Sequence, residues 1–403
     1  MGLDTTTASG VLKEFYLPAV REQLNSKADF LAEVERNAED VEGLEAVLSL
    51  HVSRNGGIGS RVEGGYIPAP GEQGYVKQRV GLKRHYGAFQ VSGPVIKAMK
   101  SDDGSWLRAV ESESKGLIND IRLDHERQLL GTSDGVIAPT AANTALNTIV
   151  LAASATQIRQ FYKNMRVDIG TVANPIAVAQ SRRVTGVNRA ARTITIDGPA
   201  VTTTVNDRVF RSGNGGAGAA QKEVHGLQTI VADTGTLFGV DPSVEDVWRS
   251  YVLAAGNVDL SDALIGEVID EVALNSPSTP DWAIATHATV RKFIGNMASN
   301  RRYINEVEFN AGFKGVEVGT GTARMGLMAL KDCPDKTAFF LSKEHLKVHE
   351  ASDWEFMEED GNVLDRYIDA NGRKDAYEAT LFKYDDFATD VRGAHGKITG
   401  LLT

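Results

Sequence analysis

One glycine-rich segment near the N-terminus, Gly56–Arg84, limits what this chain can fold into. It contains eight glycines and two prolines, residues that interrupt extended runs and disfavour helix. The apolar residues between them are too sparse to bury a core. Because a two-stranded hairpin is only marginally stable alone in water, we expect an extended loop that is held by another surface or another subunit.

The composition excludes several other classes of protein. The 403 residues include 43 Lys and Arg against 53 Asp and Glu, a net charge of −10, and the single cysteine is Cys333. One cysteine excludes an internal disulfide framework and a cysteine-rich zinc module. No stretch approaches the ~20 apolar residues of a membrane span, and the N-terminus lacks a signal-peptide pattern. We therefore expect a chain that is neither secreted nor membrane-embedded. Its acidic charge disfavours nucleic-acid binding by the whole chain.

Periodicity predicts both helices and strands. Apolar residues spaced by three and four predict a long helix at 106–130, which ends at Gly131. Alternating runs separated by turn residues predict a small antiparallel barrel or sandwich at Ala155–Gly218. That insert carries a net charge of +6, which leaves −16 for the rest of the chain. Further helices are predicted at 243–253 and 260–274, and strands dominate after residue 336.

Three short motifs suggest chemistry, but their context favours structural roles. Gly131–Gly135 matches the serine nucleophile elbow around Ser133, which needs a strand before the serine and a helix after it; here the order is reversed. Gly213–Gly218 fits a dinucleotide fingerprint, but no convincing helix follows, so a linker is favoured. His345 and His349 have a metal-binding spacing without an HExxH pattern. We expect no catalytic, cofactor-binding or metal-binding residues, and no enzyme; a serine hydrolase using Ser133 is the least favoured alternative.

Charge divides the chain into complementary parts. The glycine-rich segment has a net charge of +3, with the basic residues Arg61, Lys77, Arg79, Lys83 and Arg84. A later acidic run contains Glu350, Asp353, Glu355, Glu358, Glu359 and Asp360. A basic segment without a core and an acidic run elsewhere predict contacts between copies of the chain.

The order of these parts resembles a known family. An N-terminal arm, a glycine-rich loop, one long helix, a helix-containing domain and returning strands together resemble the major capsid protein of tailed bacteriophages, the Hong Kong 97-like capsid fold. Actinobacteriophage capsids are the most similar. The local stretches that fit are Leu12–Pro18, Pro280–Thr289, Ala376–Tyr384 and Val391–Lys397. The last, an Arg-containing turn before a closing strand, is the most specific.

The resemblance implies an α+β fold with a defined division into domains. The N-terminal arm and first strand are 1–55, the extended loop 56–84, and the peripheral domain 85–154 with a spine helix at 106–130. A β-barrel insertion domain follows at 155–218, then the axial domain at 219–335 and the return strands of the peripheral domain at 336–403. Some relatives join subunits through a Lys–Asn isopeptide bond. Here Asp375 or Ala376 occupies the Asn position and Lys383 the helper Glu position, so no such bond is expected.

The resemblance also implies a function. Many copies would self-assemble as pentamers and hexamers into an icosahedral shell of the virion, built in the bacterial host cytoplasm. The shell would enclose double-stranded DNA without specific binding. Expected partners are the chain itself and portal, scaffolding and decoration proteins, with no cofactor and no membrane. The basic insert is expected on the outer surface, against acidic neighbours. An encapsulin-type nanocompartment shell is the alternative with the same fold.

Overall fold

The computed structural model describes most of the chain. Described are residues 30–31, 33–38, 40–94, 103–152, 157–217, 220–296, 306–308, 314–319, 324–358, 362–369 and 372–402. Most of the expected N-terminal arm lies outside these ranges, as do Glu359 and Asp360 of the acidic run.

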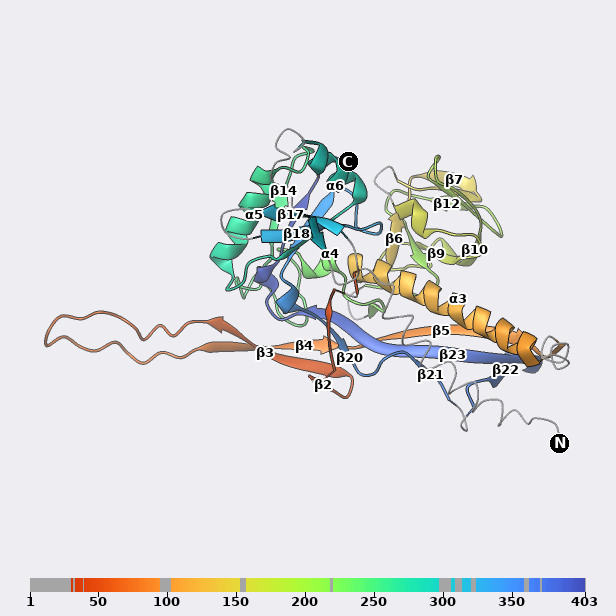
Figure 1. Cartoon of the computed structure of the whole chain (residues 1–403), viewed down its shortest axis with the longest axis horizontal. Helices are drawn as coiled ribbons and strands as arrows, with labels where there is room; N and C mark the ends of the chain where they lie inside the picture. The colour runs from red at the N-terminus through yellow and green to blue at the C-terminus, as the bar shows by residue number, and fades with distance from the viewer. Residues whose placement is uncertain are drawn as a thin grey trace.

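A six-stranded sheet runs along the long axis of the molecule (Figure 1). Its main strand, β23 (Gly372–Thr389), pairs antiparallel with β5 (Lys83–Ser92) along much of its length. The same strand pairs with β20 (Leu346–Glu350), β21 (Glu355–Phe356) and β22 (Asp365–Asp369), and β1 (Glu35–Asn37) adds a parallel edge to β20. Strands close in space are thus supplied by both ends of the chain.

The predicted long helix is present as α3 (Asp103–Leu130) and packs on this sheet (Figure 1). Ile118 joins Trp354 and Leu381 in the buried contact between them. Gly87 on β5 permits the close approach, because a Cβ there would lie 2.2 Å from Cδ1 of Ile121. A side chain at position 87 would therefore separate the helix from the sheet.

The glycine-rich segment belongs to a hairpin that projects from the body (Figure 1). β3 (Glu45–Ser53) pairs antiparallel with β4 (Gly74–Gly81), and β2 (Val41–Glu42) extends the base. The loop residues around Ile67 form no strand, and the partner of β4 is the preceding strand β3. Gly57 and Gly71 meet where the loop begins, and a Cβ on Gly57 would lie 2.7 Å from the Gly71 nitrogen.

An antiparallel β-rich unit follows α3. One sheet has the order β6 (Val136–Pro139), β13 (Arg208–Arg211), β9 (Arg166–Gly170), β10 (Ala179–Asn188), β11 (Thr193–Ile196) and β8 (Thr148–Val150). β12 (Val201–Thr203) pairs with β7 (Asn143–Leu146), and the unit has its own apolar core. The predicted start at 155 is too late, because β6, β7 and β8 are hydrogen-bonded into this unit.

A mixed seven-stranded sheet forms the remaining body. Its order is β14 (Tyr251–Ala254), β24 (Gly396–Thr399), β19 (Thr337–Leu341), β15 (Trp282–Ala285), β18 (Arg324–Ala329), β17 (Lys314–Gly319) and β16 (Glu306–Glu308). α5 (Asp262–Asn275) and α6 (His287–Asn296) pack with it. The segment 336–403, expected in one domain, is therefore divided between this sheet and the long one.

The helix predicted at 243–253 is wrong, whereas that at 260–274 is confirmed as α5. Asp241 Oδ1 accepts a hydrogen bond from the Ser243 nitrogen at 2.8 Å. Such a local bond stabilises a turn in competition with helix, and strand β14 follows it. Among the helices of the described ranges, none is sufficiently long and apolar to cross a lipid bilayer.

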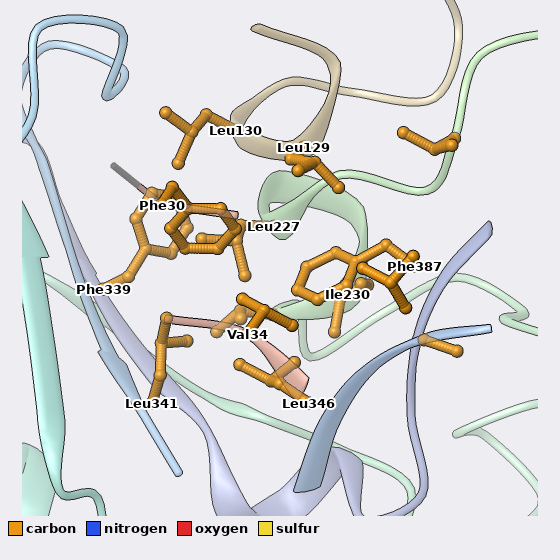
Figure 2. Close-up of a cluster of buried hydrophobic side chains, with 14 of the residues drawn as sticks. Phe30, Val34, Leu129, Leu130, Leu227, Ile230, Phe339, Leu341, Leu346 and Phe387 are labelled. Atoms are coloured by element: carbon orange, nitrogen blue, oxygen red, sulfur yellow. The ribbon is translucent and has the colours of Figure 1, made fainter. Parts of the chain in front are cut away.

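The central core lies where these parts meet (Figure 2). The Phe30 ring stacks on Trp282 at 5.1 Å between centroids and meets Phe387 edge-on at 5.9 Å. α4 (Leu227–Ile230) and the last residues of α3 contribute Leu227, Ile230, Leu129 and Leu130. This core joins residues from almost the whole length of the chain.

The turn around Arg392 is buried beside this core. Its guanidinium donates hydrogen bonds to the carbonyl oxygens of Ile230 at 2.9 Å and Gly235 at 3.0 Å. The turn is the short helix η5 (Arg392–Ala394), which leads into β24. Burial lowers the pKa of Arg392 to about 10, which is still well above neutral pH. The side chain is therefore a cation there, and it donates to carbonyl groups at and after the end of α4.

Candidate functional site

The tip of the projecting hairpin carries apolar side chains that the described part of the chain leaves uncovered. Tyr66 is 96% exposed and Ile67 is 87% exposed, and Ile58 and Val62 are similarly open. All four come from one loop, and exposed apolar groups gathered in one part of a surface are a feature of interaction sites. We call this group of four residues the hairpin tip.

The predicted basic residues do not form one patch. Arg61 lies in the loop, where its Nε donates to the Tyr66 carbonyl oxygen at 3.1 Å. Lys77 and Arg79 lie two residues apart on the exposed face of β4, and Arg79 pairs with Glu45 at 3.3 Å. Lys83 and Arg84 belong to β5 instead, and Lys83 Nζ donates to the Gln221 carbonyl oxygen at 3.1 Å.

The acidic run is partly neutralised within the chain itself. Glu350 lies 2.6 Å from Lys383 Nζ and 3.8 Å from Arg36, and Asp353 lies 3.6 Å from Arg36. Glu355 is half-buried on β21, while Glu358 is exposed. The sequence did not predict that Arg36 and Lys383 pair with the acidic run. Both are distant from it in the sequence, and strands β1 and β23 place them beside it.

The hairpin and the strands β21 and β22 lie toward opposite ends of the long axis (Figure 1). A contact between the hairpin tip and this acidic part of the sheet therefore requires two copies of the chain. A head-to-tail contact of this type repeats, and it closes into a ring when the rotation permits.

Comparison with solved structures identifies the fold. The chain is similar to the capsid asymmetric unit of cyanophage A-1(L), with a TM-score of 0.54, 10% identity and 94% of each chain covered. The chain has a phage capsid fold. A structure of Mycobacterium phage Bobi matches at a TM-score of 0.44 with 8% identity and 99% of each chain covered. The holo-SrpI encapsulin complex from Synechococcus elongatus PCC 7942 matches at 0.45 with 9% identity, covering 94% of this chain and 89% of that one. No protein-family model and no curated protein sequence matches the chain.

Within this capsid fold, the three suspected motifs occupy structural positions. Ser133 is buried after the end of α3, and its hydroxyl bonds to Thr229 at 3.1 Å. In the second motif, the Gly213 nitrogen donates to Asp168 Oδ2 at 2.8 Å and the Asn214 amide donates to Glu223 at 2.8 Å. The carboxylates of Asp168 and Glu223 therefore lie beside this loop, where they would repel a phosphate group.

The two histidines of the third motif do not lie on one helix. His345 ends the short helix η4 (Lys343–His345), where Nδ1 bonds to Asp390 at 2.8 Å and Nε2 to Ser278 at 2.7 Å. His349 lies in β20 and is buried. Because a helical spacing has no meaning across a helix end and a strand, the pair does not form the site that the spacing suggested.

A buried polar cluster lies between α3 and the long sheet of the capsid fold. His85 Nε2 is 3.2 Å from Asp385 Oδ1, and His125 Nε2 is 3.5 Å from Asp385 Oδ2. Lys383 Nζ lies 3.2 Å from Asp385 Oδ2. Sequence reasoning missed the cluster; the one available signal was that the charged residues Lys383 and Asp385 alternate in step with the apolar residues Leu381 and Phe387.

The cluster shifts the pKa values of its members in different directions. Burial lowers the pKa of His125 to about 4. Burial also opposes the charged form of His85, but the neighbouring Asp385 carboxylate outweighs it and raises the pKa of His85. Burial would raise the pKa of Asp385, yet His125 and Lys383 hold it well below its usual range. Near neutral pH, Asp385 is thus an anion and His125 a neutral imidazole.

Proposed function

We propose that this chain is a major capsid protein of a tailed bacteriophage. Many copies self-assemble as pentamers and hexamers into an icosahedral shell that encloses double-stranded DNA, and the role is structural rather than enzymatic. The likeness to the cyanophage capsid subunit over 94% of both chains supports the proposal. The protein is then a component of the virion that is assembled in the host cytoplasm. Portal, scaffolding and decoration proteins are its further partners.

The observation that carries the proposal is the exposed hairpin tip. The loop at the end of the hairpin, where Tyr66 and Ile67 are almost fully exposed, gains little stability from the described part of its own chain. At about 25 cal/mol per Å² of apolar surface, covering these side chains favours association. A neighbouring copy is the occupant we assign, because the hairpin and the strands it would cover lie at opposite ends of the molecule.

The domain assignment follows from the same proposal. α3 serves as the spine helix of a peripheral domain built on the long sheet. The seven-stranded sheet with α5 and α6 serves as the axial domain around the vertices. The β-rich unit of β6 to β13 is the insertion domain; we place it on the outer surface, where its basic residues brace acidic neighbours. Within the chain, its Arg211 already pairs with Asp124 of α3 at 2.7 Å, which illustrates the type of contact expected.

Electron microscopy of the purified full-length chain tests the function. We expect hollow closed particles or five- and six-membered capsomers. A chain that remains monomeric at all concentrations and salt conditions, with or without a scaffolding protein, would contradict the proposal. Shells that co-purify with one abundant enzyme inside would support the encapsulin alternative. A reconstruction that places the β-rich unit on the inner surface against DNA would contradict its outer position.

We further propose that the basic stem of the hairpin lies across the acidic run, or the spine helix, of the neighbouring subunit. Lys77 and Arg79 are the best probes because both are exposed on β4, even though Arg79 pairs with the likewise exposed Glu45, whereas Lys83 is partly buried against Gln221. Opposite charges across an interface raise the association rate and make it salt-dependent.

Changing Lys77 and Arg79 to Glu is expected to slow assembly at low salt and to reduce its salt dependence. Light scattering during assembly measures both. The matched control changes Arg291 and Lys331 to Glu, which gives the same change in net charge outside the hairpin. Equal behaviour of the two variants across salt concentrations would refute the proposed contact.

A further inference from the structure

Three side chains that can bind metal converge between α3 and the long sheet. They are His85 on β5, His125 on α3 and Asp385 on β23, and one ligand atom from each lies within 4.8 Å of the others. The two histidine-to-aspartate distances are 3.2 and 3.5 Å. Zinc bonds of about 2.0–2.2 Å in a tetrahedron place neighbouring ligand atoms roughly 3.3–3.6 Å apart. Each histidine lies at about this spacing from one carboxylate oxygen, His85 from Oδ1 and His125 from Oδ2, and the three side chains converge on one place.

The same side chains have polar atoms without hydrogen-bond partners. Both ring nitrogens of His125, both carboxylate oxygens of Asp385 and Nε2 of His85 are buried and make no hydrogen bond within the described part of the chain. They meet at ion-pair distances only. Since buried polar atoms in folded proteins are normally satisfied, this concentration of unsatisfied atoms indicates a ligand.

A cavity gives a ligand access to the cluster. It has a volume of about 180 Å³ and is lined by both histidines, with Tyr86, Gln128 and Trp354 among its other walls. His85 is also partly exposed, with 10% of its side chain accessible. An ion can reach the two imidazoles through this cavity, and the space can hold a water as a fourth ligand.

We propose that His85, His125 and Asp385 form a binding site for a divalent transition metal ion of the zinc class. Two imidazole nitrogens and one carboxylate suit zinc, cobalt or nickel, whereas calcium and magnesium prefer all-oxygen ligands. Three protein ligands and a water complete a tetrahedron.

The charge of Lys383 limits the affinity of the proposed site for a cation. Its Nζ lies 3.2 Å from Asp385 Oδ2, where its charge opposes a bound cation. Glu350, at 2.6 Å from the same Nζ, compensates this charge, and Asp385 Oδ1 faces His85 instead. The site therefore discriminates against ions that bind by charge alone and favours those that form strong bonds to nitrogen.

Such an ion would connect three elements that are distant in the sequence. β5, α3 and β23 are otherwise joined by apolar packing and strand pairing. A metal that binds only the folded chain stabilises it by mass action. The bound ion would cross-link the long helix to the long sheet and so stabilise the folded chain. This role is distinct from the assembly contacts of the hairpin.

Cobalt(II) titration of the full-length chain, dialysed first against a chelator, tests the site. We expect one cobalt per chain with the intense visible absorption of tetrahedral coordination, its loss on adding zinc, and a rise in Tm with zinc. His125→Ala and His85→Asn are each expected to weaken zinc binding at least tenfold. The matched control His345→Asn also removes a histidine paired with an aspartate, but outside the cluster, and should bind as the unmodified chain does.

Three results would overturn the proposal. One is the absence of a tetrahedral cobalt spectrum and of any zinc-dependent shift in Tm for the unmodified chain, a measurement that depends on no variant folding. The other is cobalt binding that survives in His85→Asn, which alters the residue at the cavity and is the milder change if His125→Ala fails to fold. Loss of binding in the His345→Asn control would equally contradict it, because the ion would then be held elsewhere.

Discussion

The central core and the hairpin tip use the same kinds of side chain in opposite ways. In the core, Trp282 and Phe387 are both buried against Phe30; Figure 2 shows Phe30 and Phe387 within this cluster. At the tip, Tyr66 and Ile67 are almost fully exposed. Each buried aromatic side chain already contributes to the stability of one chain, whereas each exposed one contributes only when another surface covers it.

The difference separates two equilibria. Folding of a single chain depends on the core, in which both ends of the sequence meet. Association of folded chains depends on the hairpin tip, which projects away from the body (Figure 1), whereas the base of the hairpin belongs to the core through Ala46 and Val80. Variants in the core should therefore change the free energy of unfolding, and variants at the tip should change assembly. The variants below test this difference, in order of decreasing effect on the free energy of unfolding.

The largest effect is expected from Phe387→Ala. Removing a fully buried aromatic ring leaves a cavity beside Phe30 and is expected to lower the free energy of unfolding of the unassembled chain by about 3–5 kcal/mol. Urea unfolding followed by fluorescence measures it. Phe387→Leu retains much of the volume and serves as the control, with a clearly smaller loss. Equal losses for the two variants would mean that this core is loosely packed.

A smaller effect is expected from charging the core by pH. His395 is buried; its Nδ1 accepts from the Ser342 nitrogen at 3.3 Å and its Nε2 bonds to Thr389 at 2.9 Å. Burial lowers its pKa from 6.5 to about 3. Between these values the unfolded chain binds the proton and the folded chain does not, so stability is lost as the pH falls below 6.5. The loss approaches about 1.4 kcal/mol per pH unit from this group.

Unfolding at a series of pH values checks this sign. His395→Gln, whose amide can both accept and donate, is expected to reduce the slope between pH 6.5 and about 4.5, above the range in which carboxylates titrate. His125, with a pKa of about 4, retains a slope of the same sign. In the control His345→Gln, the removed group has a pKa raised by Asp390. Its contribution is present below pH 6.5 and fades above it, so this control should change the slope only at higher pH.

The sequence alone predicted features that depend on neighbours along the chain. The helix α3 followed from apolar spacing and from Gly131, and the antiparallel unit followed from alternation and turn residues. The pairing of β4 with β3 and the inclusion of β6 to β8 in the β-rich unit were missed. Periodicity can indicate that a segment is a strand, but it does not identify the strand with which that segment pairs. The buried cluster was missed for the same reason, since His85, His125 and Asp385 come from three separate elements.

The smallest effect on unfolding is expected at the hairpin tip, where Tyr66→Ser and Ile67→Ser remove two apolar side chains that their own chain does not bury. Surface substitutions of this kind usually change the free energy of unfolding by less than about 0.5 kcal/mol. Assembly should nevertheless be strongly reduced, because the same change removes the apolar surface that a neighbour would cover. Sedimentation of the assembled material, compared with urea unfolding of the unassembled chain, measures the two effects separately.

The control Val244→Ser removes an exposed apolar side chain outside the hairpin and should leave both measurements unchanged. Normal assembly of the double variant would show that the tip contributes nothing to the contacts between copies. A large loss of folding stability would show that the tip itself packs against its own chain, as the base of the hairpin does through Ala46 and Val80.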